Sequence, residues 1–292
     1  MKKKYAFIPL AVIAIAIAFS FLPGKKPMPV FDVHLHGQKN IKEQLKSLEE
    51  AGVTIAAVST SWNLQSTYAG NSSIRLLYGL MVPCPGGKVP YSQQQCFDDG
   101  KEWPNVAWVE QQVKAKKIDF IGEVLTQYHG ISSADEKMFP YYALAEKYGL
   151  PVGVHTGSAG PDHGCPTFRE DMGDPALLKP VMQKFPSMKL WIMHAGGPFL
   201  PQAIELMKAY PTIYTDISAV NNPAILPPAQ FAGLIKMFVN AGLEDRLMFG
   251  SDNAPIKTVL EAIDQLDFLT PEQKQKILYE NATRFFQPAA SK

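Results

Sequence analysis

Eight short apolar runs that alternate with amphipathic stretches predict a single α/β domain with the architecture of a (β/α)8 TIM barrel. The chain has 292 residues, a length at which a barrel of this kind forms one domain. Histidine or acidic residues recur at the ends of several runs, as expected where strands end at a common active site. A doubly wound open sheet is the main alternative, but no Gly-rich phosphate-binding loop follows the first run.

The apolar runs are short and are bounded by polar or turn-forming residues, which is typical of strands buried on both faces. In a barrel, the carboxyl ends of all such strands lie at one end of the molecule. The predicted strands are Val30–His36, Thr54–Trp62, Leu76–Val82, Ile118–Thr126, Pro151–Thr156, Lys189–His194, Ile213–Ala219 and Arg246–Ser251.

The stretches between the runs have apolar residues at three-to-four spacing, which predicts helices that cover the sheet. A last helix is expected to begin at Thr270, because Thr270-Pro271-Glu272-Gln273 forms a capping box with proline at the first helical position. The clearest helical stretches are Asn40–Ala51, Glu136–Tyr148, Pro175–Phe185, Pro201–Ala209 and Pro228–Ala241.

The first 22 residues are expected to be an export segment that precedes the fold. Lys2, Lys3 and Lys4 are followed by an apolar stretch from Ala6 to Leu22, and Ala18-Phe19-Ser20 offers a signal peptidase site. The segment is either a cleaved signal peptide or an uncleaved membrane anchor. We therefore expect a linker over residues 23–29 and a catalytic domain over residues 30–288. The domain would be periplasmic or extracellular, or anchored to the outer face of the cytoplasmic membrane.

Charge and cysteine content restrict the function classes. Lys and Arg number 28 against 27 Asp and Glu, and no basic arm or stripe appears, so nucleic-acid binding is not expected. Cys84 and Cys96 could form a disulfide across a Gly- and Pro-rich loop in an oxidising compartment, which would leave Cys165 over. Three unpaired thiols are the alternative, and the spacing does not indicate a cysteine metal site.

The most informative motif is the pair His34 and His36 in Val30-Phe31-Asp32-Val33-His34-Leu35-His36-Gly37. Alternate residues of a strand point to the same side and lie about 6.6 Å apart. Two imidazoles so placed can close on one metal ion, where Zn–N bonds measure about 2.0–2.1 Å. Two ordinary polar side chains at a strand end would give the same pattern. The residues at the other strand ends therefore decide between a metal-binding pair and an ordinary polar one.

Residues able to bind a metal end several other predicted strands. His155 and His194 each follow a short apolar run and precede glycine, whereas two further runs end in Gly122-Glu123 and in Gly250-Ser251-Asp252. In a barrel these side chains would converge at the carboxyl ends of the strands, and packing alone does not explain their recurrence there.

In this order, these motifs resemble the amidohydrolase superfamily, and within it the amidohydrolase-related branch that contains decarboxylases and lactonases. The resemblance spans roughly residues 30 to 286. It rests on Phe31-Asp32-Val33-His34-Leu35-His36, Gly122-Glu123, Gly153-Val154-His155, His194-Ala195-Gly196-Gly197, Phe249-Gly250-Ser251-Asp252 and Asn281-Ala282-Thr283-Arg284-Phe285-Phe286.

The resemblance implies a metal held by His34, His36, His155 and Asp252. It implies that His194 binds a second metal or polarises the substrate. Many members carry a carboxylated lysine on the fourth strand, where this chain has Glu123. Glu123 could bridge two metals, but we expect one Zn²⁺ with Glu123 as a peripheral ligand or a supporting group.

The residue chemistry is consistent with these implied roles. Imidazole and carboxylate ligands suit Zn²⁺, and also Mn²⁺, Fe²⁺ or Co²⁺. A catalytic zinc lowers the pKa of a bound water to about 7. Asp252 could accept a proton from that water and pass it to the leaving group. His194 could stabilise the charge that develops on the attacked oxygen.

Other polar residues are candidates for supporting or substrate-binding roles. Arg169 could hold a substrate carboxylate, and His129 could contact substrate or be an ordinary loop histidine. Asp32 is expected to fix backbone or the second nitrogen of a ligand, or to be purely structural, and Asp216 to support the site. His163 lies in a long loop, Gly157–Asp174, over the predicted site. The long segments Trp62–Arg75 and Pro83–Pro104 are expected to form binding surfaces or lids.

We expect a metal-dependent hydrolase that cleaves an ester, lactone or amide bond in a small molecule. A non-oxidative, metal-dependent decarboxylase of a small carboxylic acid is the alternative enzyme, because the branch uses the same ligands for both reactions. A non-catalytic barrel that binds a metal or ligand is the alternative from another class. An N-terminal membrane tether and an oligomer are both compatible with the sequence.

Overall fold

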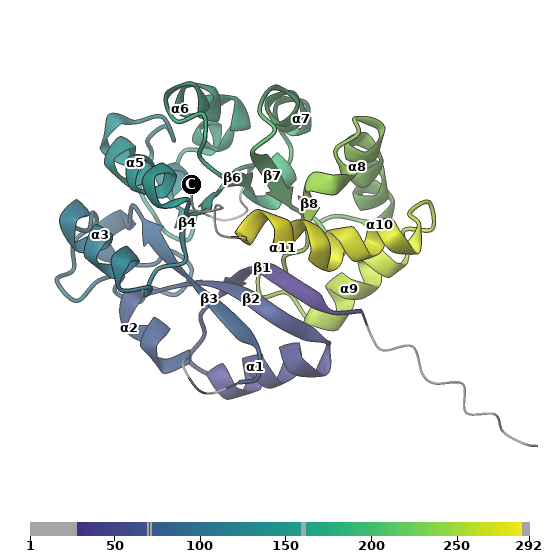
Figure 1. Ribbon diagram of the computed structural model, residues 1–292, viewed down its shortest axis with the longest axis horizontal. Coiled ribbons are helices and arrows are strands. Elements are labelled where there is room, and N and C mark those ends of the chain that lie inside the picture. The colour runs from purple at the N-terminus through teal and green to yellow at the C-terminus, as the bar shows by residue number, and fades with distance from the viewer. Residues whose placement is uncertain (1–27, 69, 71, 159–161, 288–292) are drawn as a thin grey trace, which may run out of the picture.

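The computed structural model describes residues 28–68, 70, 72–158 and 162–287, in which eight parallel strands form one sheet (Figure 1). The strands follow one another in the sheet in the order in which they occur in the chain. This is the topology of a TIM barrel, as the sequence predicted. The strands are β1 (Val30–His36), β2 (Val53–Thr60), β3 (Arg75–Val82), β4 (Phe120–Val124), β5 (Val152–Val154), β6 (Leu190–Ile192), β7 (Ile213–Asp216) and β8 (Leu247–Met248).

The barrel is nearly closed, and its seam lies between β1 and β8. The Val33 amide donates to the Phe249 carbonyl at 3.0 Å, and the Asp252 amide donates to the His34 carbonyl at 2.8 Å. The last strand is shorter than predicted because the Phe249 amide donates to the Ile277 carbonyl, at 2.9 Å, instead of continuing a ladder. The apolar run at Phe249 therefore continues beyond the strand itself.

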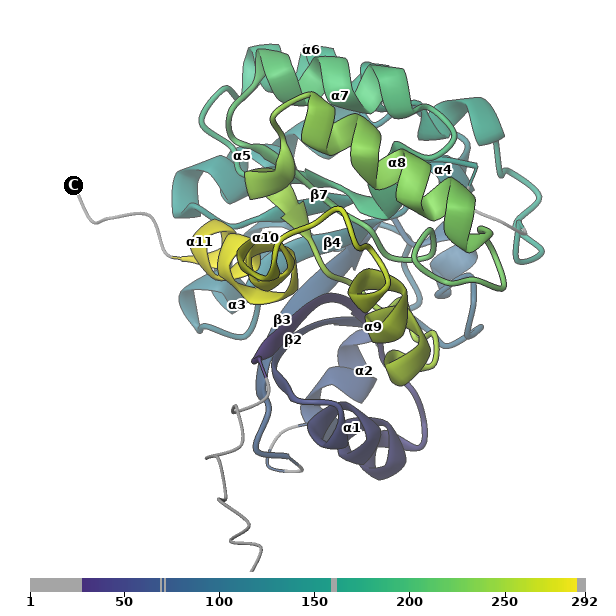
Figure 2. The same cartoon turned by 90° about the vertical axis from the view of Figure 1, so that its right-hand side faces the viewer.

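Helices surround the sheet (Figures 1 and 2). Each helix predicted from apolar spacing is present, and both hydrogen bonds of the capping box at Thr270 and Gln273 are formed. Short 3-10 turns and a π-helical segment, Lys276–Glu280, complete the connections. The α-helices are α1 (Ile41–Glu50), α2 (Trp62–Gln65), α3 (Val106–Lys114), α4 (Thr126–His129), α5 (Phe139–Tyr148), α6 (Lys179–Lys184), α7 (Leu200–Ala209), α8 (Pro228–Asn240), α9 (Ile256–Asp264), α10 (Pro271–Gln275) and α11 (Asn281–Phe286).

The C-terminal helix α11 covers one end of the barrel, and both views show it across that end (Figures 1 and 2). The Phe286 ring lies 5.2 Å from that of Phe31 and 5.4 Å from that of Trp191, measured between ring centroids. Phe31 and Phe120 are at or near the amino ends of their strands and are fully buried. This end is therefore an apolar core, which leaves the carboxyl ends of the strands for polar residues.

A disulfide joins Cys84 to Cys96, which confirms the bridge that was one of two expectations. Cys165 is a free, buried thiol. Inside the bridged loop, the Val89 amide donates to the Gln94 carbonyl at 2.8 Å, so the loop turns back on itself. The loop follows β3 and therefore lies at the carboxyl end of the barrel.

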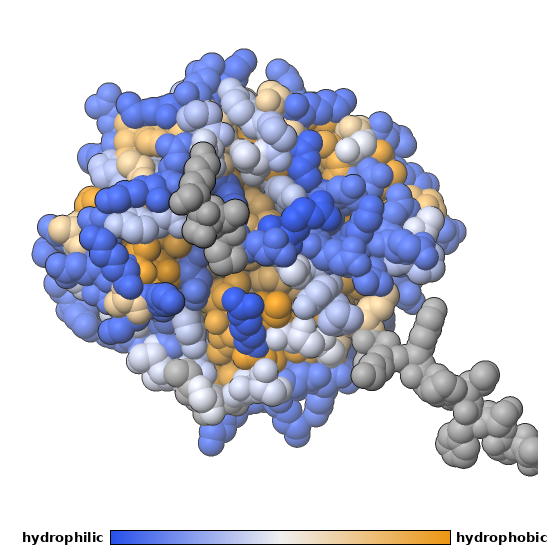
Figure 3. Space-filling view, viewed as in Figure 1, coloured by the Kyte–Doolittle hydropathy of each residue, from blue (hydrophilic) through white to orange (hydrophobic). Residues whose placement is uncertain are grey.

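The N-terminal segment proposed for export lies outside the described residues. Among the residues that are described, no helix has the length and apolar character needed to cross a membrane. Polar side chains cover much of the face drawn in Figure 3, with apolar side chains visible between them. In the described part of the chain, the exposed large apolar side chains are Met28, Ile225 and Met237.

Candidate active site at the carboxyl ends of the strands

Four histidines and two carboxylates from five strand ends meet at one end of the barrel. The topology brings them together because parallel strands of a barrel place their carboxyl ends around one centre. The sequence predicted this convergence, and the structure places every one of the six within reach of another. They are His34 and His36 on β1, Glu123 on β4, His155 after β5, His194 after β6 and Asp252 after β8.

Glu123 lies at the centre of the imidazole cluster. Its Oε1 is 3.6 Å from Nε2 of His155 and 3.9 Å from Nε2 of both His34 and His194. Its Oε2 is 3.5 Å from Nε2 of His36, and its side chain is almost completely buried. Whether Glu123 is a peripheral ligand or a supporting group stays a prediction.

Asp252 lies at the accessible edge of the cluster. Its Oδ1 is 3.0 Å from Nε2 of His36 and 3.9 Å from Nε2 of His34. Its side chain is 26% exposed, whereas the side chain of His36 is 9% exposed. Among the six residues, Asp252 is thus the one best placed to meet solvent and a ligand.

The cluster has the donor atoms and spacing of a metal centre. Within each of two sets, His34–His36–Asp252 and His34–Glu123–His194, the ligand atoms all lie within 4.8 Å of one another. Two atoms bound to one zinc ion at about 2.1 Å each lie no more than about 4.2 Å apart, and the measured separations of 3.0 to 3.9 Å fall within that limit. His34 belongs to both sets, and its Nε2 is buried without a hydrogen-bond partner among the described residues. These residues fit a divalent cation.

Acceptors behind the imidazoles orient them toward the centre. Nδ1 of His34 lies 3.1 Å from Oδ2 of Asp216, and Nδ1 of His155 lies 2.7 Å from Oε1 of Gln127. Nδ1 of His194 lies 3.0 Å from the Ser218 hydroxyl. When Nδ1 carries the proton, the Nε2 lone pair faces the centre and is free to bind a metal.

Asp216 supports the site from behind, as the sequence predicted. Its carboxylate accepts from Nε1 of Trp191 at 3.2 Å and from the backbone amides of His194 and Ser218, each at 3.0 Å. It also accepts from the Ser218 hydroxyl at 2.6 Å. Its position at the end of β7, inside an otherwise apolar run, was the signal that identified it.

Asp32 fixes backbone rather than a ligand nitrogen. Its carboxylate accepts from the backbone amides of His34, at 3.1 Å, and Ser251, at 2.9 Å, and from the Ser251 hydroxyl at 2.5 Å. It therefore ties β1 to the loop after β8. Of the two structural roles considered for Asp32, backbone fixation is confirmed.

The loops that carry His194 and Asp252 have unusual backbone conformations. His194, Asp252 and Asn253 have φ angles of 59°, 49° and 56°, in the left-handed region that non-glycine residues rarely adopt. Such conformations cluster at functional sites, where the surrounding structure enforces them. Gly250 permits the close approach of the loop, because a Cβ there would lie 2.7 Å from Cβ of His34.

Aromatic rings from two long loops and α4 lie beside the site. The Tyr91 ring lies 4.1 Å from the His36 ring, and the Tyr128 ring lies 4.9 Å from the His155 ring. The His163 ring lies 5.8 Å from that of Tyr128 and 6.2 Å from that of Tyr91. The sequence predicts His163 over the site and a lid or binding surface in the loop that carries Tyr91, but it does not indicate a role for Tyr128, Gln127 or Ser218.

Arg169 and His129 bind carboxylates of the chain itself. Nη2 of Arg169 is 2.5 Å from Asp171, and the Arg169 side chain is 56% exposed. Nε2 of His129 is 3.2 Å from Oε2 of Glu102. Binding of a substrate by either residue stays a prediction, and it would require release of these partners.

The family model described as Amidohydrolase matches residues 96–287, about two thirds of the chain. The chain belongs to this amidohydrolase family. No curated protein is similar enough in sequence to match it.

Solved structures with the same fold include both hydrolases and decarboxylases, and the similarity shows the fold alone. One is described as a probable 2-pyrone-4,6-dicarboxylic acid hydrolase from Acinetobacter baumannii, with a TM-score of 0.63 and 14% identity over 89% of this chain and 99% of that one. A 5-carboxyvanillate decarboxylase from Sphingomonas paucimobilis has a TM-score of 0.60 and 10% identity over 90% and 100%. Another from Novosphingobium aromaticivorans, complexed with manganese, has a TM-score of 0.57 and 14% identity over 84% and 79%.

The electrostatics of the amidohydrolase site balance burial against charge. Burial alone would lower the pKa of His34, but the carboxylates of Asp216, Asp252 and Glu123 raise it to about 10. Burial would raise the pKa of Glu123, but the surrounding histidines lower it to about 2. Burial lowers the pKa of His155 to about 3, so its imidazole is neutral and ready to act as a ligand. The carboxylates of the cluster thus favour positive charge at the centre.

Family membership, enzyme neighbours and this arrangement together support an enzyme. Either hydrolysis or decarboxylation is compatible with the amidohydrolase fold.

Proposed function

We propose that this amidohydrolase is a metal-dependent hydrolase that cleaves an ester, lactone or amide bond of a small molecule. The position of Asp252 carries the proposal. It is the partly exposed carboxylate at the edge of a buried imidazole cluster, 3.0 Å from Nε2 of His36. A general base for hydrolysis must reach both the cation site and the substrate, and the Asp252 side chain contacts the cluster at His36 while it remains 26% exposed.

The metal would be held by His34, His36 and His155 together with Glu123 and Asp252. Their imidazole and carboxylate groups suit Zn²⁺, and also Mn²⁺, Fe²⁺ or Co²⁺. A divalent metal supplies polarisation of the attacked bond and makes the attacking water more acidic.

The residues of the chain supply the proton transfers and the orientation. The Asp252 carboxylate accepts the proton of the attacking water and donates it to the leaving group. Burial opposes protonation of His194, but the contact with Glu123 raises its pKa, so this imidazole can donate a hydrogen bond to the attacked oxygen. Removal of such a donor typically reduces kcat by about 10²–10³-fold.

Decarboxylation would require a group that holds the substrate carboxylate close to the metal. Among the described residues, the two side chains considered for that task, Arg169 and His129, each contact an acidic side chain of the chain itself. This observation favours hydrolysis over decarboxylation.

The test compares the wild type with Asp252→Asn. Metal content is measured by elemental analysis, and turnover is measured on a panel of lactones, esters, amides and aromatic carboxylic acids. Because three histidines and Glu123 remain, Asp252→Asn is expected to retain the metal and to lose turnover by at least about 10²-fold. Asp264→Asn, at a side chain that is 90% exposed, is the matched control and should leave turnover unchanged.

Three results would overturn the proposal. Release of carbon dioxide without a hydrolysed bond would establish the decarboxylase. Full activity of Asp252→Asn would remove the assigned base. A wild-type protein loaded with metal but inactive on the whole panel would favour a binding barrel.

We also propose that the domain is exported, either released after cleavage of a signal peptide or tethered by an uncleaved anchor. The Lys-rich and apolar segment before Pro23 supports export. The Cys84–Cys96 disulfide supports an oxidising compartment. Cell fractionation followed by N-terminal sequencing tests the proposal, which recovery of the full chain in the cytoplasm would contradict.

A further inference from the structure

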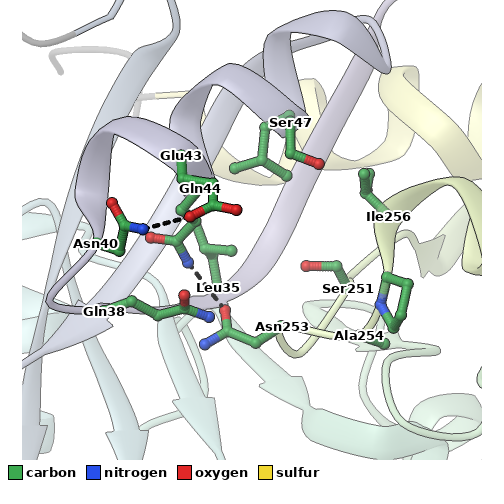
Figure 4. Close-up of a pocket in the computed structure, with 12 residues that line it drawn as sticks. Leu35, Gln38, Asn40, Glu43, Gln44, Ser47, Ser251, Asn253, Ala254 and Ile256 are labelled. Atoms are coloured by element: carbon green, nitrogen blue, oxygen red, sulfur yellow. Dashed lines mark hydrogen bonds between the residues drawn. The ribbon is translucent and has the colours of Figure 1, made fainter.

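A polar cavity of about 220 Å³ lies between α1 and the loop after β8 (Figure 4). Two amide side chains, Gln44 and Asn253, extend into it from opposite sides. Nε2 of Gln44 donates to the His36 carbonyl at 2.9 Å and to Oδ1 of Asn253 at 3.1 Å. Oδ1 of Asn253 also accepts from the His36 amide at 3.1 Å. The two side chains therefore bind both backbone polar groups of His36.

A buried tyrosine determines which way the Gln44 amide points. The Gln38 backbone amide donates to the Tyr68 hydroxyl at 2.7 Å, so the hydroxyl oxygen is an acceptor there. Its own proton goes to Oε1 of Gln44, at 2.6 Å. Because Oε1 is held in this way, Nε2 must face His36 and Asn253. Tyr68 is fully buried, so this anchor is shielded from water.

The network bridges the seam between β1 and β8. Strand β8 has two residues, and Asp252 and Asn253 beyond it both have left-handed backbone conformations. His36 and Asp252 nevertheless lie on opposite sides of this seam with Nε2 and Oδ1 3.0 Å apart. A link between the backbone of His36 and the side chain that follows Asp252 restrains the separation of the two groups.

We propose that Gln44 and Asn253 are positioning residues that hold His36 and Asp252 at the spacing that a bound cation requires. The inference rests on the proposed metal-dependent function. Supporting residues of this kind typically change metal affinity by about 10–100-fold when they are removed. Loss of either amide would free the end of β1 from the loop after β8. His36 and Asp252 would then have to be ordered when the cation binds, which would weaken binding.

The experiment measures Zn²⁺ affinity by chelator competition, and the absorption spectrum of the Co²⁺-substituted protein, for the full domain and its variants. Asn253→Gly removes the side chain while glycine tolerates the φ of 56°. Asn253→Asp keeps the acceptor oxygen and serves as the conservative rescue. Gln44→Leu removes the donor with little change in volume. Ser47→Ala, on the same helix and lining the same cavity, is the matched control.

We expect Asn253→Gly and Gln44→Leu to weaken Zn²⁺ binding by about 10–100-fold and to alter the Co²⁺ spectrum. Asn253→Asp and Ser47→Ala should bind Zn²⁺ within about threefold of the wild type. A lower Tm of the metal-free variants with unchanged Zn²⁺ affinity and Co²⁺ spectrum would show a merely structural role and overturn the inference. If Gln44→Leu does not fold, the comparison of Asn253→Gly with Asn253→Asp decides.

A double variant, His34→Ala with His36→Ala, separates this inference from the function on which it rests. If the wild type binds no more Zn²⁺ than the double variant, the proposed metal-dependent function fails and the inference fails with it. If only the double variant loses Zn²⁺ while Asn253→Gly and Gln44→Leu bind normally, the inference alone fails.

Discussion

Three of the four imidazoles of the site are oriented by acceptors of different kinds, whereas Nδ1 of His36 is buried without a hydrogen-bond partner among the described residues. His34 faces a carboxylate, His155 an amide oxygen and His194 a hydroxyl. The acceptor affects both the position of the ring proton and the basicity of the nitrogen that faces the centre. The three rings are therefore expected to bind a cation with different strengths, although they are the same residue type.

Gln127 offers the clearest test of this orientation, because its side-chain amide forms hydrogen bonds through both its oxygen and its nitrogen. Its Oε1 holds His155, and its Nε2 donates to the Gly157 carbonyl at 2.8 Å. Gln127→Leu is expected to lower Zn²⁺ affinity by about 10–100-fold, because the His155 ring loses its fixed tautomer. Gln127→Glu, which keeps the acceptor, should lose less. Isothermal titration calorimetry of the metal-free proteins measures the Zn²⁺ affinities of the wild type and of the two variants. Equal affinities for all three would contradict the role of Gln127.

The ligand-type residues could be predicted from sequence, whereas their supports could not. His34, His155 and Asp252 each follow an apolar run, and that local pattern is visible in the chain itself. Gln127 and Ser218 have no such pattern, because their roles depend on which strand ends lie beside one another. Tyr91 reaches His36 from a loop closed by a disulfide, and no sequence spacing indicates that contact.

At the scale of elements, close packing inside the barrel depends on a residue without a side chain on β5. A Cβ at Gly153 would lie 2.3 Å from the Trp191 ring of β6 and 2.5 Å from Cε of Met193. Gly153 is thus what allows the indole to fill the barrel interior beside the strand that ends at His155.

Gly153→Ala is therefore expected to lower the free energy of unfolding by about 1–3 kcal/mol, because the added methyl group overpacks the interior. Gly233→Ala is the control, since a Cβ there meets no atom within 4 Å. Gly233 lies within α8, where alanine is favoured over glycine by up to about 1 kcal/mol. Urea denaturation should thus show a lower free energy of unfolding for Gly153→Ala and a higher one for Gly233→Ala. A free energy of unfolding that changes in the same direction in both variants, or in the reverse directions, would reject this account of the packing.

A carboxylate that joins α3 to α5 predicts a pH dependence of stability. Oε1 of Glu110 accepts from Nζ of Lys147 at 2.7 Å and from the Tyr148 hydroxyl at 2.5 Å, and these bonds lower its pKa to about 2. A carboxyl whose pKa is lower in the folded state stabilises that state above its ordinary pKa of 4.5, and the effect is lost as the pH falls toward 2.

Glu110→Gln should be less stable than the wild type at pH 7, and the difference should shrink between pH 4.5 and pH 3. Urea denaturation of both proteins across this range measures the difference. The effect is expected to be small because the pair is exposed to solvent. A difference that is constant with pH would show that the Glu110 charge does not contribute.

The predicted strand positions were correct, but most of the predicted carboxyl ends were too long. Apolar residues continue past the last ladder bond, as at Phe249, whose amide bonds to Ile277 instead. Trp62 likewise begins α2 rather than ending β2. A run of apolar residues indicates that a segment is buried, but it does not show where the strand within that segment ends.

At the scale of the whole molecule, the sequence of apolar runs was enough to predict the barrel, because each run pairs with the next. One end is closed by the rings around Phe286 and the other holds the polar cluster. A bound cation at that end would link β1, β4, β5 and β8, and would thereby stabilise the whole domain.

Removal of the metal should lower the Tm of the entire domain. A ligand at about 1,000 times its Kd adds about 4.1 kcal/mol to the free energy of unfolding, and each kcal/mol shifts the Tm of a domain of this size by about 2–4 °C. Differential scanning calorimetry with and without a chelator measures the shift. The His34→Ala, His36→Ala variant should show no response to the chelator, and a similar response in both proteins would place the metal elsewhere.

The seam between β1 and β8 also sets when the site can come into existence. His36 and Asn253 are 217 positions apart in the chain, so the ligands on the first strand are synthesised long before the loop that completes the set. A nascent chain that still lacks that loop already carries the four histidines and Glu123, but its first strand has no partner at the seam. Closure of the barrel around the cluster must therefore follow synthesis of nearly the whole polypeptide, because the backbone contacts across the seam come from Phe249 and Asp252.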